Sequence, residues 1–263
     1  MKRHLRLFTL YFAQYAKVRM AYKADFIIAF FSSMAATVFG FGFVLVLFSK
    51  IPRLQDWSFG EILFLYGFSL IPLGFFNVIS WNLYDFGELY IIEGRFDRVL
   101  LRPVDSLFQI AFEKFRLESL QEVVTGLAVV VYAGRKLNLH WGVAEGVWFG
   151  LMVLCGAVIY FTVFLILTAV SFWFEDRVGI VPPVFNMLNF GRYPLTIYNV
   201  FIQFMLSWII PFGFASFYPT THFLGREGFT TYFYLVPVVA VSFALLARVV
   251  WVRGVANYSS TGS

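Results

Sequence analysis

Long uncharged stretches alternate with short charged segments along most of the chain. Residues 26–48 contain no charged side chain, and a helix of this length, rising about 1.5 Å per residue, spans the roughly 30 Å hydrocarbon layer of a bilayer. The third stretch is weaker because Glu118 and Glu122 lie in its first turns, so its polar start must be sheltered by protein. The pattern predicts an all-α, polytopic membrane protein with six transmembrane helices, near residues 26–48, 62–81, 117–133, 146–174, 195–217 and 229–247.

The residues before the first span mix basic side chains with apolar ones at a spacing of three or four. The apolar positions of this pattern are Leu7, Tyr11, Tyr15, Val18 and Tyr22. The spacing predicts an amphipathic helix over residues 1–24 that lies in the membrane interface, ahead of a six-span domain over residues 25–263. A signal peptide is the competing interpretation, but its apolar stretch would be short, rich in aromatic residues and without a small-residue cleavage site.

Composition agrees with a lipid environment. Hydrophobic residues make up 60% of the chain and charged residues 13%, whereas about a quarter of an ordinary soluble domain is charged. The net charge of +5 does not indicate nucleic-acid binding, because outside the apolar stretches no basic run alternates with aromatic residues. The basic residues instead report topology.

The predicted spans divide the twenty lysines and arginines unequally between the two sides of the membrane. Fifteen fall on the side of the N-terminus, and five fall on the other side, namely Lys50, Arg53, Arg135, Lys136 and Arg226. Positively charged loops stay in the cytoplasm. We therefore expect a multi-pass protein of the plasma (cell inner) membrane with both termini cytoplasmic.

Motifs for catalysis, nucleotide binding and metal binding do not occur in the sequence. It contains no GxxxxGK[ST] phosphate loop, no HExxH or CxxC pair and no GxSxG turn, which are the patterns that bind phosphate, bind zinc or activate a serine. Its three histidines, His4, His140 and His222, lie far apart. We expect no catalytic residue, no metal site and no cofactor bound by this chain.

The largest loop on the predicted cytoplasmic side combines arginines with apolar side chains. Its centre, residues 93–103, reads EGRFDRVLLRP, in which Gly94 can end one helix and Pro103 can end the next. Apolar side chains on a loop that faces water are typical of a surface that binds a partner protein. The alternative is a loop that folds back onto its own helix ends, and the residues alone leave the two interpretations equal.

The same segment resembles the Gly-x-hydrophobic-Asp-x-x-Leu-Leu-Arg-Pro signature of a six-span family of type-2 ATP-binding cassette (ABC) exporter permeases. The matching residues are Gly94, Phe96, Asp97, Leu100, Leu101, Arg102 and Pro103. Residues 190–194, 210–214, 218–219 and 253–260 are similar to weaker features of that family, in the same order. The resemblance therefore covers nearly the whole chain.

This resemblance implies an exporter built from two permeases, identical or related, and two cytoplasmic ATPase subunits that bind ATP and Mg²⁺. The loop between spans two and three would be the ATPase-coupling loop, with Phe96 to Leu101 seated in the ATPase; its residues are Gly94, Arg95, Phe96, Asp97, Arg98, Leu100, Leu101, Arg102 and Pro103. A second, smaller contact would come from Glu175, Asp176 and Arg177. If the phenylalanine-rich spans line the route, they favour a hydrophobic or amphipathic cargo, such as a lipid, a drug-like compound or a peptide; the alternative is that these rings face the acyl chains of the membrane.

Polar side chains within the predicted spans are candidates for lining a transport pathway. Asn77 and Gln203 are the main ones, with hydrogen bonding between helices as the alternative. Glu118 and Glu122 are further candidates, with simple exposure to the cytoplasm as the alternative.

The alternative function is an ion-coupled secondary transporter, which calls for buried ionisable groups in two related halves. No ionisable group lies at mid-span, and the sequence shows no internal repeat.

Overall fold

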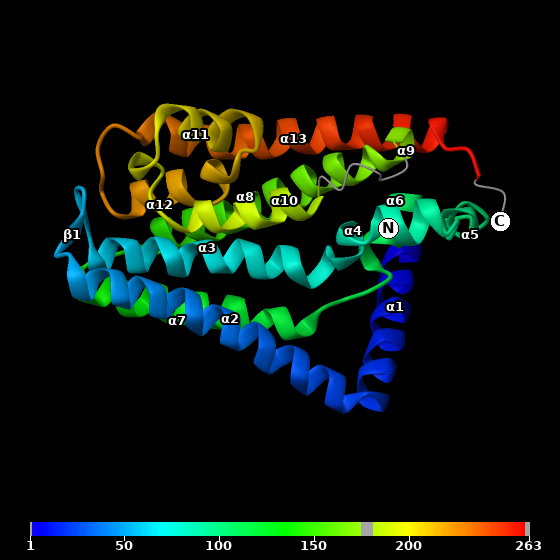
Figure 1. Cartoon of the computed structure of the whole chain (residues 1–263), viewed down its shortest axis with the longest axis horizontal. Coiled ribbons are helices and arrows are strands. Elements are labelled where there is room, and N and C mark those ends of the chain that lie inside the picture. The colour runs from blue at the N-terminus through cyan, green and yellow to red at the C-terminus, as the bar shows by residue number, and fades with distance from the viewer. Residues whose placement is uncertain (1, 175–180, 261–263) are drawn as a thin grey trace.

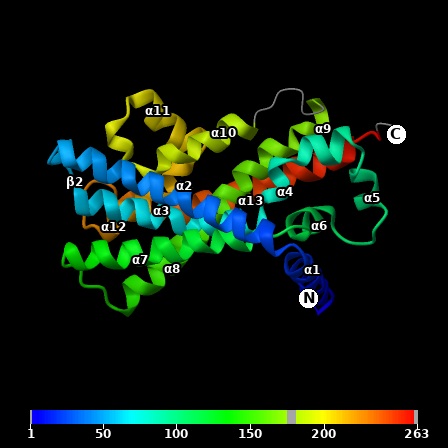
Figure 2. The ribbon, with the colours of Figure 1, turned by 60° about the horizontal axis from the view of Figure 1, so that its bottom comes forward.

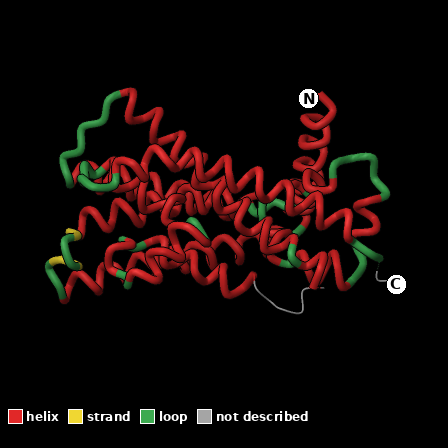
Figure 3. Tube along the Cα trace, turned by 90° about the horizontal axis from the view of Figure 1, so that it is seen from above, coloured by secondary structure: helices red, strands yellow, loops and turns green. Residues whose placement is uncertain are grey.

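The computed structural model describes residues 2–174 and 181–260, and almost all of them are helical (Figure 3). Five helices are long and apolar enough to cross a membrane, and one bent pair of helices makes a sixth candidate. The five are α2 (Lys23–Lys50), α3 (Phe59–Ile79), α7 (Leu120–Lys136, preceded by the 3₁₀ turn η2, Leu117–Ser119), α8 (Val143–Ala169) and α13 (Thr230–Asn257). The all-α, polytopic membrane class is confirmed.

Short elements lie at the two ends of the bundle, which we call the hairpin end and the loop end (Figure 1). The hairpin end contains the antiparallel strands β1 (Arg53–Leu54) and β2 (Trp57–Ser58). The loop end contains α4 (Trp81–Tyr84), the π-helix η1 (Gly87–Ile92), α5 (Phe96–Leu100), α6 (Ser106–Phe112) and α9 (Ser171–Phe174).

Helix α3 is the centre of the bundle, and most of its residues are buried. It begins at a capping box, in which the Ser58 side chain accepts from the backbone N–H of Glu61 and the Glu61 carboxylate accepts from the N–H of Ser58. Glu61 also pairs with Arg226 at 2.9 Å, and Arg226 lies over the Trp57 ring at 3.7 Å. These contacts hold the start of α3 to the chain before α13.

Helices α3 and α7 approach each other so closely that only glycine fits at the contact. A Cβ atom on Gly126 would lie 2.6 Å from the backbone oxygen of Gly67, and one on Gly74 would lie 3.0 Å from the backbone nitrogen of Val123. Small residues permit this approach between helices in membranes, where close van der Waals packing drives association. The weak third span is therefore held by its partner helix.

Helices α8 and α13 run in the same direction. Trp148 packs against Phe233 near the start of both helices, and Phe172 packs against Trp251 near their loop-end termini. The chain between them must therefore return from the loop end to the hairpin end.

The return is made by a chain of short helices: α10 (Val181–Met187) and the 3₁₀ turns η3 (Leu188–Arg192) and η4 (Leu195–Ile197). Phe185 contacts Tyr84 beyond the loop-end terminus of α3, whereas Thr196 accepts a hydrogen bond from Trp57 before its start. Residues 185–196 thus pass along the whole of α3, and Figure 2 shows α10 leading towards α11.

The span predicted near residues 195–217 differs from the structure, because these residues belong to a bent pair and not to one continuous helix. Its first arm is formed by α11 (Val200–Phe204) and η5 (Met205–Ile209), and its second by η6 (Gly213–Phe217) and α12 (Tyr218–Phe223). The arms meet at 80°. Pro211 lies in the break. Proline interrupts a helix because it has no N–H and its ring clashes with the preceding helical turn.

Irregular backbone within a membrane is tolerated only where protein covers it. In the bent pair, side chains cover the break. Phe212 and Phe214 are fully buried, Ser216 donates to the carbonyl of Gly191 at 2.7 Å, and Ser207 and Tyr218 share a hydrogen bond of 2.8 Å. The bent pair packs back into the hairpin end.

Helix α1 (Lys2–Ala21) runs crosswise to the long helices and stands apart from them (Figures 1 and 3). It is joined to the bundle through aromatic contacts of Phe8 with Phe112 and Phe115, and of Tyr15 with Phe115. Its bounds agree with the amphipathic helix predicted over residues 1–24.

The α3–α7 contact predicts a position-specific effect of adding one methyl group. We expect Gly126→Ala to lower stability by about 1–3 kcal/mol, because the new Cβ forces two backbones apart. Gly134→Ala on the same helix meets no atom within 4 Å, and we expect it to be neutral or to stabilise by up to about 1 kcal/mol. Thermal unfolding in detergent measures both, and equal melting temperatures for the two variants would contradict the close packing.

Candidate functional site

The first residues of the loop between α3 and α7 are hydrogen-bonded to the rest of the bundle. The Asn82 side chain donates to the carbonyl of Ile110 at 2.7 Å, and Thr168 of α8 donates to the carbonyl of Leu83 at 2.9 Å. Gly94 then adopts φ of +68°, a conformation that favours glycine, and turns the chain from η1 into α5. Gly94 therefore ends one helix, as the sequence predicted.

Phe96 points into its own chain and is fully buried. Its ring packs against Tyr258 at 5.0 Å, Phe172 at 5.1 Å and Phe86 at 5.8 Å between centroids. The expectation that Phe96 seats in a partner protein is therefore wrong. Its physical role is to anchor α5 to the loop-end termini of α8 and α13.

Asp97 holds the chain that follows α13. Its carboxylate accepts a hydrogen bond from the Tyr258 hydroxyl at 3.0 Å and another from the Ser260 hydroxyl at 2.7 Å. Burial, and then the hydrogen bond to Asp97, raises the pKa of Tyr258 to about 12, so this hydroxyl stays protonated and donates at neutral pH. Asp97, which matches the family signature, therefore has a structural role as the acceptor for residues 258 and 260.

Helix α6 fixes the other side of α5. Gln109 is buried, and its side chain donates to the carbonyls of Val99 at 3.1 Å and Val104 at 3.0 Å. Asp105 caps α6 by accepting from the N–H of Phe108, and it pairs with Arg248 of α13 at 3.1 Å. The loop is consequently a rigid extension of the bundle.

One side of α5 remains open. Leu101 is 83% exposed and Leu100 46%, and Arg98, Arg102 and Pro103 beside them are exposed as well. We call these five residues the docking surface. It unites both sequence interpretations, because the loop folds back through Phe96 and Asp97 and still presents apolar side chains among arginines.

A pocket of about 160 Å³ adjoins this surface. Arg98 lines it from α5, Arg95 and Arg102 line it from the two sides of α5, and Glu113 and Lys114 line it from the segment after α6. Arg95 is also paired with Glu93 at 2.7 Å, on an exposed part of the loop. The carboxylates of Glu93 and Glu113 offset part of this charge, so the surroundings of the docking surface are positive on balance, which suits an acidic partner surface.

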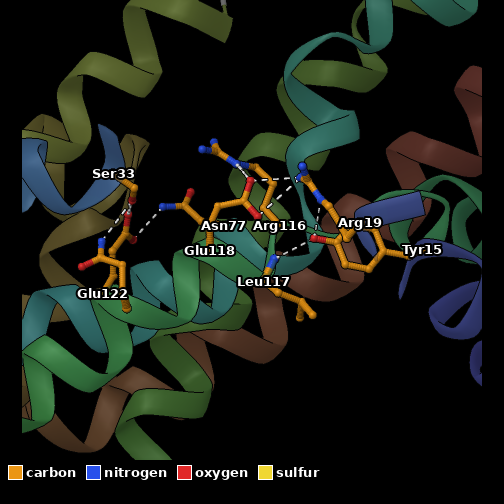
Figure 4. A network of polar contacts seen from close by, with 9 residues as sticks. Tyr15, Arg19, Ser33, Asn77, Arg116, Leu117, Glu118 and Glu122 are labelled. Atoms are coloured by element: carbon orange, nitrogen blue, oxygen red, sulfur yellow. Dashed lines mark hydrogen bonds and ion pairs between the residues drawn. The ribbon is translucent and has the colours of Figure 1, made fainter. Parts of the chain in front are cut away.

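The start of α7 contains a buried ion cluster that the sequence did not reveal. Glu118 is 2% exposed and pairs with Arg19 of α1 at 3.1 Å and with Arg116 at 3.3 Å. Arg116 in turn lies 3.9 Å over the Trp81 ring, and Tyr15 accepts from the backbone N–H of Leu117 (Figure 4). Glu118 thus connects α1 to α7 and is not simply exposed.

One turn further along, Glu122 connects α7 to two other helices. Its carboxylate accepts from Asn77 of α3 at 2.9 Å and from Ser33 of α2 at 3.4 Å (Figure 4). Gln121 donates to Ser33 and to Thr37 of α2. Sequence reasoning singled out Asn77, Glu118 and Glu122, but it could not pair them with residues of other helices, because those partners lie 45 to 99 residues away.

The remaining predicted residues are not brought together. Asn77 lies near the loop end beside Glu122, whereas Gln203 lies in α11 at the hairpin end and donates to the carbonyl of Tyr198. Glu175, Asp176 and Arg177 lie outside the described residues. Among residues that the structure describes, no group of three or more His, Cys, Asp and Glu could hold a metal ion.

The fold and the loop define a multi-pass membrane protein that presents exposed leucines and arginines at one end. The family model described as ABC-2 family transporter protein matches residues 31–262, so the chain belongs to this family. It is therefore the membrane-spanning component of an ABC transporter, and it is not the nucleotide-binding unit. Comparisons with curated proteins and with solved structures find no match.

The Glu118 cluster predicts strong coupling between two residues that are distant in sequence. In a double-mutant cycle of Arg19→Ala and Glu118→Gln, we expect a coupling energy of about 1–2 kcal/mol, because the carboxylate is buried. The exposed pair Glu93→Gln and Arg95→Ala is the matched control, for which we expect about 0–1 kcal/mol. Unfolding in detergent measures both cycles, and a smaller coupling for Arg19 and Glu118 than for the control would contradict the buried connection.

Proposed function

We propose that this chain is the permease subunit of an ATP-driven exporter and that its docking surface binds a cytoplasmic ABC ATPase. ATP and Mg²⁺ bind to that partner, and this chain binds no cofactor. The observation that carries the proposal is an 83% exposed leucine, Leu101, presented among arginines by a loop whose other side is fixed in the bundle. A residue that anchors a protein interface needs such a rigid support.

The loop offers two routes by which movement of the ATPase reaches the membrane. Through Phe96 and Asp97, α5 is joined to α9, which follows α8, and to the loop-end terminus of α13. Through the segment after α6, it leads to Glu118 and Glu122, which connect α7 to α1, α2 and α3. A push on the docking surface is in this way distributed over six helices.

The distribution of basic residues supports a cytoplasmic loop end. The five lysines and arginines assigned to the other side lie at or beside β1, the hairpin-end termini of α2 and α7, and the turn after α12. By the positive-inside rule, the loop end and both termini then face the cytoplasm. This orientation presents the docking surface to soluble ATPases beneath the plasma (cell inner) membrane.

Exposed apolar surface supports both a second permease and an apolar cargo. Only Thr37 and Val44 of α2 are buried, and Phe39 is 77% exposed. A groove of about 610 Å³ between α3 and α8 is lined by apolar side chains, including Phe75 and Phe161. We propose that α2 faces a second copy or a related permease and that the cargo is hydrophobic or amphipathic. Membership in the ABC-2 family favours an ATP-driven exporter over the alternative function, an ion-coupled secondary transporter.

The docking surface predicts which substitutions release the ATPase. In a mild-detergent pull-down, we expect an ABC ATPase to copurify with the wild type. Because buried anchors dominate interface energies, its recovery should fall at least about tenfold with the triple variant Leu100→Ala, Leu101→Ala, Arg102→Ala. The matched control is Leu10→Ala with Lys17→Ala, exposed residues of α1 whose replacement should leave recovery unchanged.

The melting temperature of the triple variant should equal that of the wild type, since these side chains are exposed. If the ATPase remains bound to a folded triple variant, the docking surface is wrong. If no ATPase accompanies the wild type in any detergent, the exporter proposal itself is wrong.

A further inference from the structure

A groove of about 520 Å³ lies in the corner between α1, α2 and the segment that leads into α7. Tyr15, Val18 and Arg19 line it from α1, and Asp25 and Ala29 line it from the first turns of α2. Figure 1 shows α1 meeting the start of α2 at this corner. Since α2 and α7 both begin here as spanning helices, the groove lies where these helices leave the hydrocarbon layer.

The polar wall of the groove has an excess of positive charge. It contains three cationic side chains, Arg19, Lys114 and Arg116, and two carboxylates, Asp25 and Glu118. Glu118 is shared by the two arginines, whereas Lys114 has no hydrogen bond or ion pair with any residue that the structure describes and is exposed. The groove therefore has a net charge of +1, and its cation without a described partner is Lys114, whose flexible ammonium group binds phosphate well.

The rest of the lining is apolar and aromatic. Val18, Ala29, Phe115 and Trp81 contribute to it, and Trp81 is already stacked under Arg116. An apolar wall with a cationic edge matches an amphiphile with an acyl chain and one negative charge, and not a soluble anion, which makes no use of the apolar part. Basic amphipathic helices recognise anionic lipids in the same physical way.

We infer that this groove holds one anionic phospholipid of the surrounding membrane. Lys114 binds its phosphate, the outward N–H groups of Arg19 and Arg116 flank it, and an acyl chain follows Val18 and Ala29 along α2. The lipid then fills the corner between α1 and the bundle, beside the aromatic contacts and the Glu118 cluster that join the two. The single charge of the phosphodiester balances the excess of one.

Lipid retention tests this assignment without the ATPase, on the purified full-length protein. After detergent exchange, the protein is incubated with equal amounts of phosphatidylglycerol and phosphatidylcholine, and bound lipid is counted by native mass spectrometry. We expect one phosphatidylglycerol on the wild type, about tenfold less on Lys114→Ala, and retention close to wild type on Lys114→Arg. Lys17→Ala removes an exposed lysine of α1 that is not in the groove, and it should bind like the wild type.

Several outcomes would overturn the assignment. Equal loss of phosphatidylglycerol with Lys17→Ala would mean that binding follows overall charge, and equal retention of phosphatidylcholine would mean that the groove does not select an anion. Phosphatidylglycerol should also raise the melting temperature of the wild type but not of Lys114→Ala. If inorganic phosphate raises it to the same degree, the ligand is a free anion and the acyl chain has no role.

Discussion

The need to compensate two carboxylates at the start of α7 shapes the loop end of this structure. A charge that leaves water must meet opposite charge or hydrogen-bond donors, and inside a membrane this requirement is stricter still. Glu118 meets it with arginines from α1 and from the preceding segment, and Glu122 meets it with side chains of α2 and α3. Four parts of the chain therefore converge on two turns of one helix.

The contacts within the loop between α3 and α7 explain why its backbone is ordered while some of its side chains are free to contact a partner. Its aromatic and acidic side chains are used internally, since Phe96 fills an aromatic pocket and Asp97 binds the residues after α13. The side chains left outside are leucines and arginines. A docking element of this kind loses little conformational entropy on binding, because its backbone is already fixed.

Much of this architecture was predictable from the sequence, and the exceptions have physical causes. Helices α2, α3, α7, α8 and α13 follow from long apolar runs, because hydropathy depends on local composition alone. The bent pair around Pro211 did not follow, since residues 195–217 are as apolar as a spanning helix. Pro211 explains where the helix breaks, but the 80° angle between the arms depends on packing against helices that are distant in sequence. The ABC-2 family was recognisable from the loop signature around Gly94 and Pro103.

Site roles were harder to predict than helices. An apolar residue beside arginines can face inward or outward, and nothing local distinguishes buried Phe96 from exposed Leu101. Pairings such as Arg19 with Glu118 join residues 99 positions apart, and a single sequence gives no signal for them. By contrast, the polar start of α7 was correctly expected to need shelter, because that requirement follows from the residue types themselves.

The contact between Asp97 and Tyr258 also bears on the order in which the molecule is made. The two residues are separated by 161 positions, which at about 5–20 residues per second corresponds to roughly 10–30 s of translation. During that interval the aromatic pocket around Phe96 lacks Trp251 and Tyr258, and the loop has no C-terminal segment to bind. The loop between α3 and α7 therefore reaches its described form only after the residues around Trp251 and Tyr258 have been synthesised.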